Sequence, residues 1–200
     1  MNILKLGIVY KKRENMPDPA LAMIEFKSIA RCIIATDALV KKAPCKILSS
    51  NPICPGKYLV VFTGEVADVD ESLKEGLAVG GDLVINSLFL PQVHLDVIPA
   101  ITATTVIKEF GAIGIIESFS VASCVVGADL AAKASDAKLV EMRLANGLGG
   151  KAYFVITGSL ADVEASIAAA KYYIASEGLL VTAEIIPSPH PDLLAKGVYW

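Results

Sequence analysis

The stretch Gly56-Lys-Tyr-Leu-Val-Val-Phe-Thr-Gly-Glu-Val-Ala-Asp-Val69 decides the fold, because it returns later as Gly150-Lys-Ala-Tyr-Phe-Val-Ile-Thr-Gly-Ser-Leu-Ala-Asp-Val163. Each copy is an apolar run rich in β-branched and aromatic residues, followed by a segment whose first turn is acidic. This pattern indicates a strand that leads into a helix. The repetition predicts that the chain contains two copies of one domain.

The similarity continues on both sides of this stretch. Upstream, the Glu, Ser, Cys and Lys residues of one copy return in the other at constant spacing, and the loop before the stretch is two residues longer in the second copy. Downstream, a Pro-x-x-His sequence closes each copy at His94 and His190. We therefore expect an N-terminal extension over residues 1–19, a first domain over 20–109 and a second over 110–200.

Each copy predicts the order β-α-β-β-α-β, an α+β fold with a mostly antiparallel sheet and helices packed on one of its faces. In the first copy, Ile29, Ile33, Thr36 and Val40 lie at helical spacing after Ser28, a candidate N-cap. The expected strands of the first copy are 22–26, 46–49, 58–63 and 82–88. Those of the second copy are 114–118, 138–144, 152–157 and 179–186, and a short helical piece is expected after Pro91 and after Pro187.

Composition excludes several classes of partner. The chain carries 18 basic and 21 acidic residues, so its net charge of -3 implies no strongly basic surface and we expect no nucleic-acid partner. Its mean hydropathy of +0.57 is high, but no uninterrupted apolar run approaches the roughly 18 residues of a membrane span, so we expect no membrane partner either. The excess apolar surface is expected to lie between subunits.

The four cysteines, Cys32, Cys45, Cys54 and Cys124, contain no C-x-x-C pair, which argues against a zinc ribbon or an intrachain iron–sulfur site. With no signal peptide, we expect them to be reduced in the cytoplasm. Cys32 and Cys124 occupy equivalent mid-helix positions and are predicted to be small buried hydrophobes, and Cys45 is predicted to be incidental.

Other residues with chemical potential are interpreted as structural. His94 and His190 are predicted to cap or pack, because no second His or Cys lies at ligand spacing. Glu25 and Glu117 pair only through the repetition, and no catalytic dyad is visible. The sequence therefore does not predict an enzyme.

Two loops differ between the copies. The first, Asn51–Lys57, holds one thiol, Cys54, between Pro52 and Pro55. Its counterpart, Ala145–Lys151, is rich in glycine and has no cysteine. Because the second loop joins two strands instead of leading into a helix, it is a weak candidate for phosphate binding.

Taken together, the motifs resemble the bacterial microcompartment (BMC) shell domain. They are a strand ending in Glu, a helix carrying Asp-Ala-Leu-Val-Lys41 or Asp-Leu-Ala-Ala-Lys133, a loop ending in Gly-Lys, then Thr-Gly-x-x-Ala-Asp-Val and Pro-x-x-His. The resemblance covers residues 20–200 and is to the unpermuted tandem type. The first loop is similar to that of the tandem shell proteins of propanediol-utilisation compartments, in which the loop cysteine holds an iron–sulfur cluster.

The resemblance implies a cytoplasmic location in a microcompartment shell. Three chains would form a homotrimer that imitates a hexamer and tiles edge to edge with other shell proteins. Lys41 and Lys133 would lie at tile edges, although Gln92 and Ser188 stand where many members of the family have an arginine. The loops implied to surround the central pore contain Ile53, Cys54, Pro55, Gly56, Lys57, Asn146, Gly147, Leu148, Gly149 and Gly150.

On a threefold axis, three Cys54 thiolates would bind a [4Fe–4S] cluster and leave its fourth iron open. Pro52 and Pro55 would restrict the loop, backbone N–H groups of Cys54, Gly56 and Lys57 could bond to the sulfides, and a nearby lysine would favour the thiolate. The cluster would relay electrons across the shell or be delivered to an encapsulated redox enzyme.

Two alternatives remain open at the level of the sequence. The first keeps the shell and omits the metal, so that the loops form a pore for metabolites or a site for another cofactor such as a flavin. The second is a soluble ferredoxin-like regulatory module that binds a small effector between the repeats.

Overall fold

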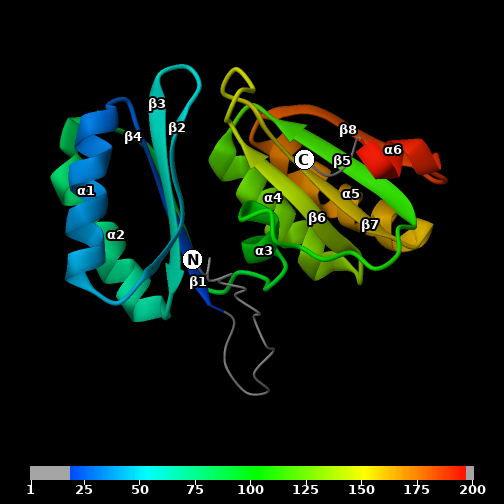
Figure 1. The fold of residues 1–200 in the computed structure, drawn as a ribbon, viewed down its shortest axis with the longest axis horizontal. Coiled ribbons are helices and arrows are strands. Elements are labelled where there is room, and N and C mark those ends of the chain that lie inside the picture. The colour runs from blue at the N-terminus through cyan, green and yellow to red at the C-terminus, as the bar shows by residue number, and fades with distance from the viewer. Residues whose placement is uncertain (1–18, 197–200) are drawn as a thin grey trace, which may run out of the picture.

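The computed structural model of the chain describes residues 19–196, which form two repeats of one α+β unit (Figure 1). The first repeat consists of β1 (Ala20–Phe26), α1 (Ile29–Lys42), β2 (Lys46–Ile53), β3 (Lys57–Gly64), α2 (Val66–Gly80), η1 (Gly81–Leu83), β4 (Val84–Leu90) and α3 (Val97–Ile101). The second consists of β5 (Ala112–Ser118), α4 (Val121–Ala134), β6 (Lys138–Leu144), β7 (Ala152–Gly158), α5 (Leu160–Ser176), β8 (Leu180–Ile186) and α6 (Pro191–Lys196).

Each repeat contains one antiparallel four-stranded sheet, in the order β2-β3-β1-β4 and β6-β7-β5-β8. The pairing register is the same in both: Ala20 faces Gly64 as Ala112 faces Gly158. In Figure 1, α1 and α2 cover one face of the first sheet, and α4 and α5 cover one face of the second. The predicted fold class is confirmed.

The first sheet is buried on both faces. Alternate residues of β1, among them Ala22, Ile24 and Phe26, pack with α1 and α2, while Leu21 and Met23 point to the opposite face. That opposite face belongs to one continuous hydrophobic cluster with residues of α4. Because both faces are covered, every residue of β1 is buried and the strand is apolar almost throughout.

Helix α1 corrects one expectation. The stripe that predicted the helix is largely exposed, since Ile29 is 45%, Ile33 54% and Val40 37% accessible. Cys32, Ala35, Thr36 and Leu39 are the residues of α1 that are buried in the repeat. Helical spacing therefore identified the helix but not the face on which it packs within one chain. Ser28 caps α1 as predicted, by accepting a hydrogen bond from the N–H of Arg31 at 3.3 Å.

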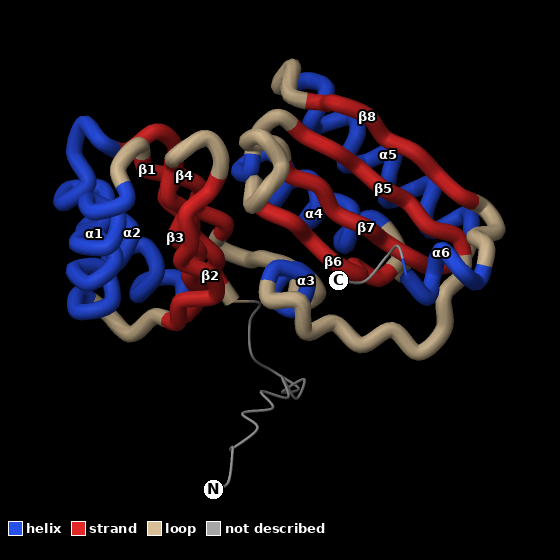
Figure 2. Tube along the Cα trace, turned by 45° about the horizontal axis from the view of Figure 1, so that its top comes forward, coloured by secondary structure: helices blue, strands red, loops and turns tan. Residues whose placement is uncertain are grey.

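The repeats meet over a packed junction. Figure 2 shows α3 lying between β2 and β6, so the connection from the first repeat is built into the interface with the second. On the α4 side, Val121 and Val125 join the cluster that contains the face of the first sheet opposite to α1 and α2. The junction thus packs a helix of the second repeat against the sheet of the first.

Several strands begin or end a few residues from the expected positions, and three boundaries have a clear structural basis. Strand β2 runs on to Ile53, so Pro52 lies in it; β2 is an edge strand, where the missing N–H of a proline is tolerated. Strand β4 begins at Val84, because Asp82 lies in the short 3₁₀ helix η1. The carbonyl of Pro19 accepts a hydrogen bond from Val93 at 2.9 Å, so Pro19 contacts the first repeat, whereas residues 1–18 of the predicted extension lie outside the described residues.

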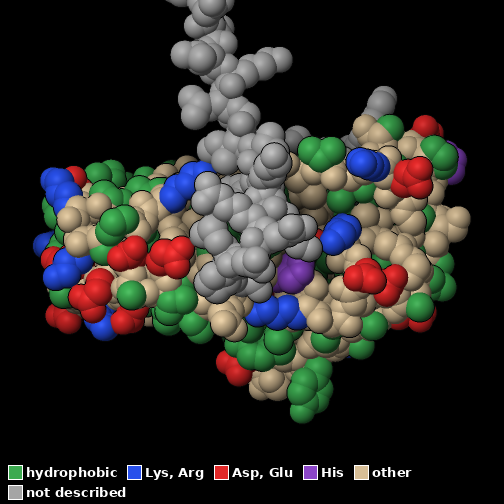
Figure 3. Space-filling model, turned by 90° about the horizontal axis from the view of Figure 1, so that it is seen from below, with side chains coloured by type: hydrophobic (Ala, Val, Ile, Leu, Met, Phe, Trp, Pro, Cys, Tyr) green, Lys and Arg blue, Asp and Glu red, His purple; other side chains and the backbone are tan. Residues whose placement is uncertain are grey.

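On the face shown in Figure 3, basic and acidic side chains are interspersed with apolar ones, and no extended basic patch is visible among the described residues there. Over residues 19–196, none of the helices combines the length and the apolar character that crossing a membrane would demand.

Candidate functional site

The two loops lie at the same end of the molecule and touch. The first loop is reduced to Cys54, Pro55 and Gly56 between β2 and β3, and Figure 1 shows it beside the longer loop between β6 and β7. The backbone N–H of Cys54 donates a hydrogen bond to the carbonyl of Ala145 at 3.1 Å. The structure therefore brings the predicted loops together within one chain, which the sequence did not reveal.

This contact corrects one part of the cluster model. The N–H of Cys54 was expected to be available to cluster sulfides, but it is bound to the carbonyl of Ala145. Ala145 is fully buried and adopts a left-handed conformation at φ 59°, which is uncommon for a residue with a side chain. The backbone of the second loop therefore holds the residue that carries the thiol.

The same contact explains why the second loop is rich in glycine. Gly150 has φ 91°, and a Cβ at this position would lie 3.4 Å from the carbonyl oxygen of Cys54. A side chain would therefore be strained by the positive φ, while its Cβ would only just touch the first loop. The glycines allow a tight turn and a close approach of two loops, and phosphate binding is not needed to account for them.

Each loop ends in a lysine held by a glutamate of the adjacent strand. Lys57 Nζ lies 2.6 Å from Glu25, whose side chain is 8% exposed, and Lys151 Nζ lies 2.5 Å from Glu117. These pairs fix the start of β3 and the region where β7 begins. Glu25 therefore compensates the charge of Lys57 within the chain.

The cysteines divide into two classes. Cys32 and Cys124 are buried, as predicted, and burial raises the pKa of the Cys32 thiol to about 11 and the pKa of Cys124 further in the same direction. Cys45 and Cys54 are half-buried, and all four thiols are free. Among residues 19–196 of one chain, no three His, Cys, Asp or Glu side chains form a group that could hold a metal ion.

The histidines act as predicted. Nδ1 of His94 accepts a hydrogen bond from the backbone of Asp96 at 3.3 Å, and Nδ1 of His190 accepts one from Asp192 at 3.2 Å. Both rings therefore cap the turn that leads into the short helix at the end of each repeat.

Lys41 and Lys133 have different surroundings. Lys133 Nζ donates to the carbonyl of Gln92 at 2.6 Å and to Asp129 at 2.7 Å, and Asp129 accepts the N–H of His94 at 2.7 Å. These contacts join the two repeats. Lys41 Nζ lies 2.5 Å from Asp37 on the same helix. Both lysines are partly exposed, and their role at tile edges remains a prediction.

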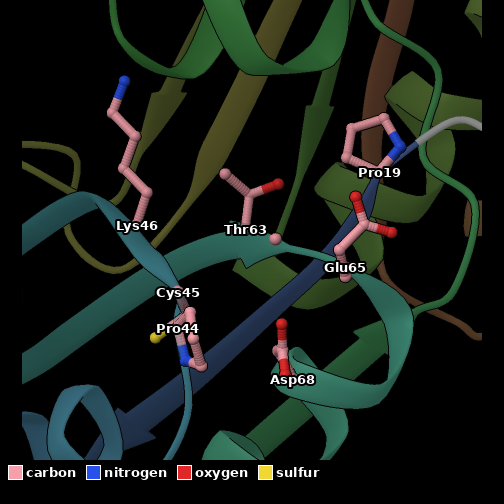
Figure 4. Close-up of a pocket in the computed structure, with 8 residues that line it drawn as sticks. Pro19, Pro44, Cys45, Lys46, Thr63, Glu65 and Asp68 are labelled. Atoms are coloured by element: carbon pink, nitrogen blue, oxygen red, sulfur yellow. The ribbon is translucent and has the colours of Figure 1, made fainter. Parts of the chain in front are cut away.

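A hollow of about 430 Å³ lies at the opposite end of the first sheet, between Pro19, Pro44, Cys45, Lys46, Thr63, Gly64, Glu65 and Asp68. Figure 4 shows Lys46 and Asp68 on opposite sides of this open depression, and the side chains do not converge on one point. We assign no function to it.

The fold and the paired loops define a protein built from two α+β domains that present hairpin loops at a common end. The BMC domain family matches residues 20–93 and 112–189, and the chain belongs to this family. It is 39% identical to the bacterial microcompartment shell protein PduT of Citrobacter freundii over 174 residues, which are 87% of this chain and 95% of that protein.

Two further relatives support the assignment, and a third protein shares only the fold. The carboxysome assembly protein CcmO of Synechococcus elongatus is 25% identical over 187 residues, covering 88% of this chain and 67% of that protein. The crystal structure of a microcompartments protein from Desulfitobacterium hafniense DCB superposes with a TM-score of 0.87 at 42% identity, covering 89% of this chain and 99% of that one. A fused permuted hexameric shell protein shares the fold at a TM-score of 0.57 and 20% identity.

Proposed function

We propose that this chain is a structural protein of a bacterial microcompartment shell, in which three copies form a pseudohexameric tile around a central pore. Membership of the BMC family and the likeness to shell proteins over nearly the whole chain support the structural role. The observation that supports the trimer is a difference in exposure between two equivalent helix faces. One is covered inside the chain, and the other is exposed.

Inside the chain, Val121 and Val125 of α4 are 2% and 0% exposed because they pack with the face of the first sheet opposite to α1 and α2. Their equivalents on α1 are Ile29 and Ile33, which are 45% and 54% exposed. Large exposed aliphatic side chains arranged on one helix face mark a protein contact. The corresponding face of the second sheet in another copy is the surface that fits them.

The polar residues of the two helices show the same difference between a covered and an exposed face. Asp129 and Lys133 bind the backbone of His94 and Gln92 across the junction. Their equivalents, Asp37 and Lys41, are exposed and pair with each other, while His190 and Ser188 are exposed at the far end of the chain. A head-to-tail interface of this kind closes into a ring, and six sectors taken two per chain require three chains.

Three chains would bring three Cys54 loops around one axis. We propose that their thiolates bind a [4Fe–4S] cluster, since a free, half-buried thiol on a restrained loop suits this role and the described residues of a single chain offer no group of three metal-binding side chains. When bound, the cluster would supply one-electron transfer across the shell or be a cargo for an encapsulated redox enzyme. The residues of the chain hold the loop in place through Ala145 and the Lys57–Glu25 pair.

The metal-free pore remains the second candidate, because the same ring would leave a passage lined by the two kinds of loop. The regulatory-module hypothesis is less favoured, since the junction between the repeats is filled by hydrophobic side chains that include Leu21, Met23, Val121 and Val125.

Anaerobic purification tests the cluster. The expected protein is brown, absorbs broadly near ~400 nm and carries about one cluster per trimer, because three thiolates supply one site. Cys54→Ser should be colourless and still trimeric, whereas Cys45→Ser, which alters the other half-buried thiol, should keep the colour. A colourless wild type after anaerobic reconstitution would leave only the pore.

A further inference from the structure

The second repeat contains a pocket of about 250 Å³ beside its loop, lined by Arg143, Asn146, Leu148 and Tyr153. Arg143 on β6 and Tyr153 on β7 are directly paired across the two strands. Tyr153 packs with the cluster of Ile113 and Val155, on the sheet face opposite to α4 and α5. The pocket therefore lies where this face of the second sheet, on which Phe110 and Leu194 also pack, reaches the loop.

A buried carboxylate orients the arginine in this pocket. Glu141 has a side chain that is only 4% exposed, and its carboxylate lies within ion-pair distance of Nε of Arg143, whose side chain is 36% exposed. Among the described residues neither oxygen of Glu141 accepts a hydrogen bond, so the contact with Arg143 is one of charge and proximity. This contact occupies one edge of the guanidinium. The two terminal amino groups are the donors through which Arg143 can reach a ligand in the pocket.

We propose that this pocket binds a small oxyanion, a carboxylate or a phosphate. A planar guanidinium donates two parallel hydrogen bonds to such a group, and the amide of Asn146 adds a further donor on the loop. Leu148 supplies an apolar wall that suits a short aliphatic carboxylate. Because Glu141 neutralises much of the charge of Arg143, binding rests on directed hydrogen bonds, and we expect dissociation constants of the order of millimolar.

The first repeat lacks the residues that make this site. The positions equivalent to Arg143 and Tyr153 are held by Asn51 and Leu59, which pair across β2 and β3 in the same register. Asn51 remains exposed although the junction beside it is formed. Leu59, the equivalent of Tyr153, is 1% exposed because it joins the hydrophobic junction. Docking of another copy in the same manner would therefore bury Tyr153 and leave the position of Arg143 open to solvent and to a ligand.

The test is site-resolved modification of arginine in the intact, iron-free protein. Phenylglyoxal is applied with sodium acetate, sodium phosphate or neutral acetamide at constant ionic strength, and modification is located by mass spectrometry. Acetate and phosphate should slow modification of Arg143 at least about threefold, since a bidentate ligand covers the reactive amino groups. Acetamide should not protect Arg143, and Arg31, an exposed arginine of α1, serves as the internal control.

Calorimetry of two variants with the same charge completes the test. Arg143→Asn copies the residue of the first repeat and should weaken acetate binding at least tenfold, whereas Lys171→Asn on α5 should leave it unchanged. Equal protection of Arg31 and Arg143, protection by acetamide, or unaltered acetate binding by Arg143→Asn would each overturn the site. Protection in the wild type remains decisive even if Arg143→Asn folds poorly, and neither measurement depends on iron.

Discussion

Replacing Ile33 by aspartate is the most direct test of the proposed trimer. Ile33 is 54% exposed in the chain, while its equivalent Val125 is fully buried in the junction between the repeats. Burying the remaining half of an isoleucine side chain contributes roughly 1 kcal/mol. An unpaired carboxylate at the same place costs a further ~2 kcal/mol or more. We therefore expect a loss of about 3 kcal/mol at each junction, or more than a hundredfold in each association constant.

Sedimentation velocity at micromolar concentration should find wild type as a trimer and Ile33→Asp as a monomer. Thermal unfolding followed by circular dichroism should show that the variant chain stays folded, because Ile33 is exposed within its own repeat. Val106→Asp, which places the same charge on a linker residue that is 85% exposed, should remain trimeric. A trimeric Ile33→Asp protein, or a variant that loses chain stability instead of assembly, would refute the assignment of this helix face.

Three further predictions concern the loops and thiols. Glu25→Gln should lower the free energy of unfolding in urea by about 1 kcal/mol, because Lys57 loses a largely buried partner; an unchanged value would mean that the pair does not anchor the loop. Gly150→Ala should cost about 1–2 kcal/mol in the same assay, since φ is 91°; a neutral effect would count against the left-handed conformation of Gly150. In cluster-free native protein at pH 8, iodoacetamide should label Cys45 and Cys54 but spare Cys32. Folding raises the pKa of Cys32 from 9.0 to about 11. The stability gained by keeping this thiol neutral in the folded chain is therefore complete below pH 9 and declines as the pH rises toward 11. Urea titrations in this pH window should show the decline in the free energy of unfolding.

The repetition made the fold predictable. Two copies of one pattern, which run from Gly56 to Val69 and from Gly150 to Val163, predicted the element order and the hairpins, because apolar periodicity and turn chemistry are local properties of the chain. The burial of two cysteines and the capping role of the histidines were predicted from the same local sequence patterns. Element ends were less predictable: β2 continues through Pro52 because an edge strand tolerates it, which depends on where the strand lies in the sheet.

The sequence by itself therefore determined two tandem α+β domains and two loops of different length, of which only the first contains a cysteine. Only the tertiary structure decided which face of α1 is buried, that Ala145 binds the backbone of Cys54, and that Arg143 stands over a buried glutamate. The first two features depend on segments that lie far apart in the chain, and the third depends on the burial of Glu141, a neighbour of Arg143 on β6. Helical and strand periodicity states which residues share a face, but only the packing of distant segments determines what that face meets.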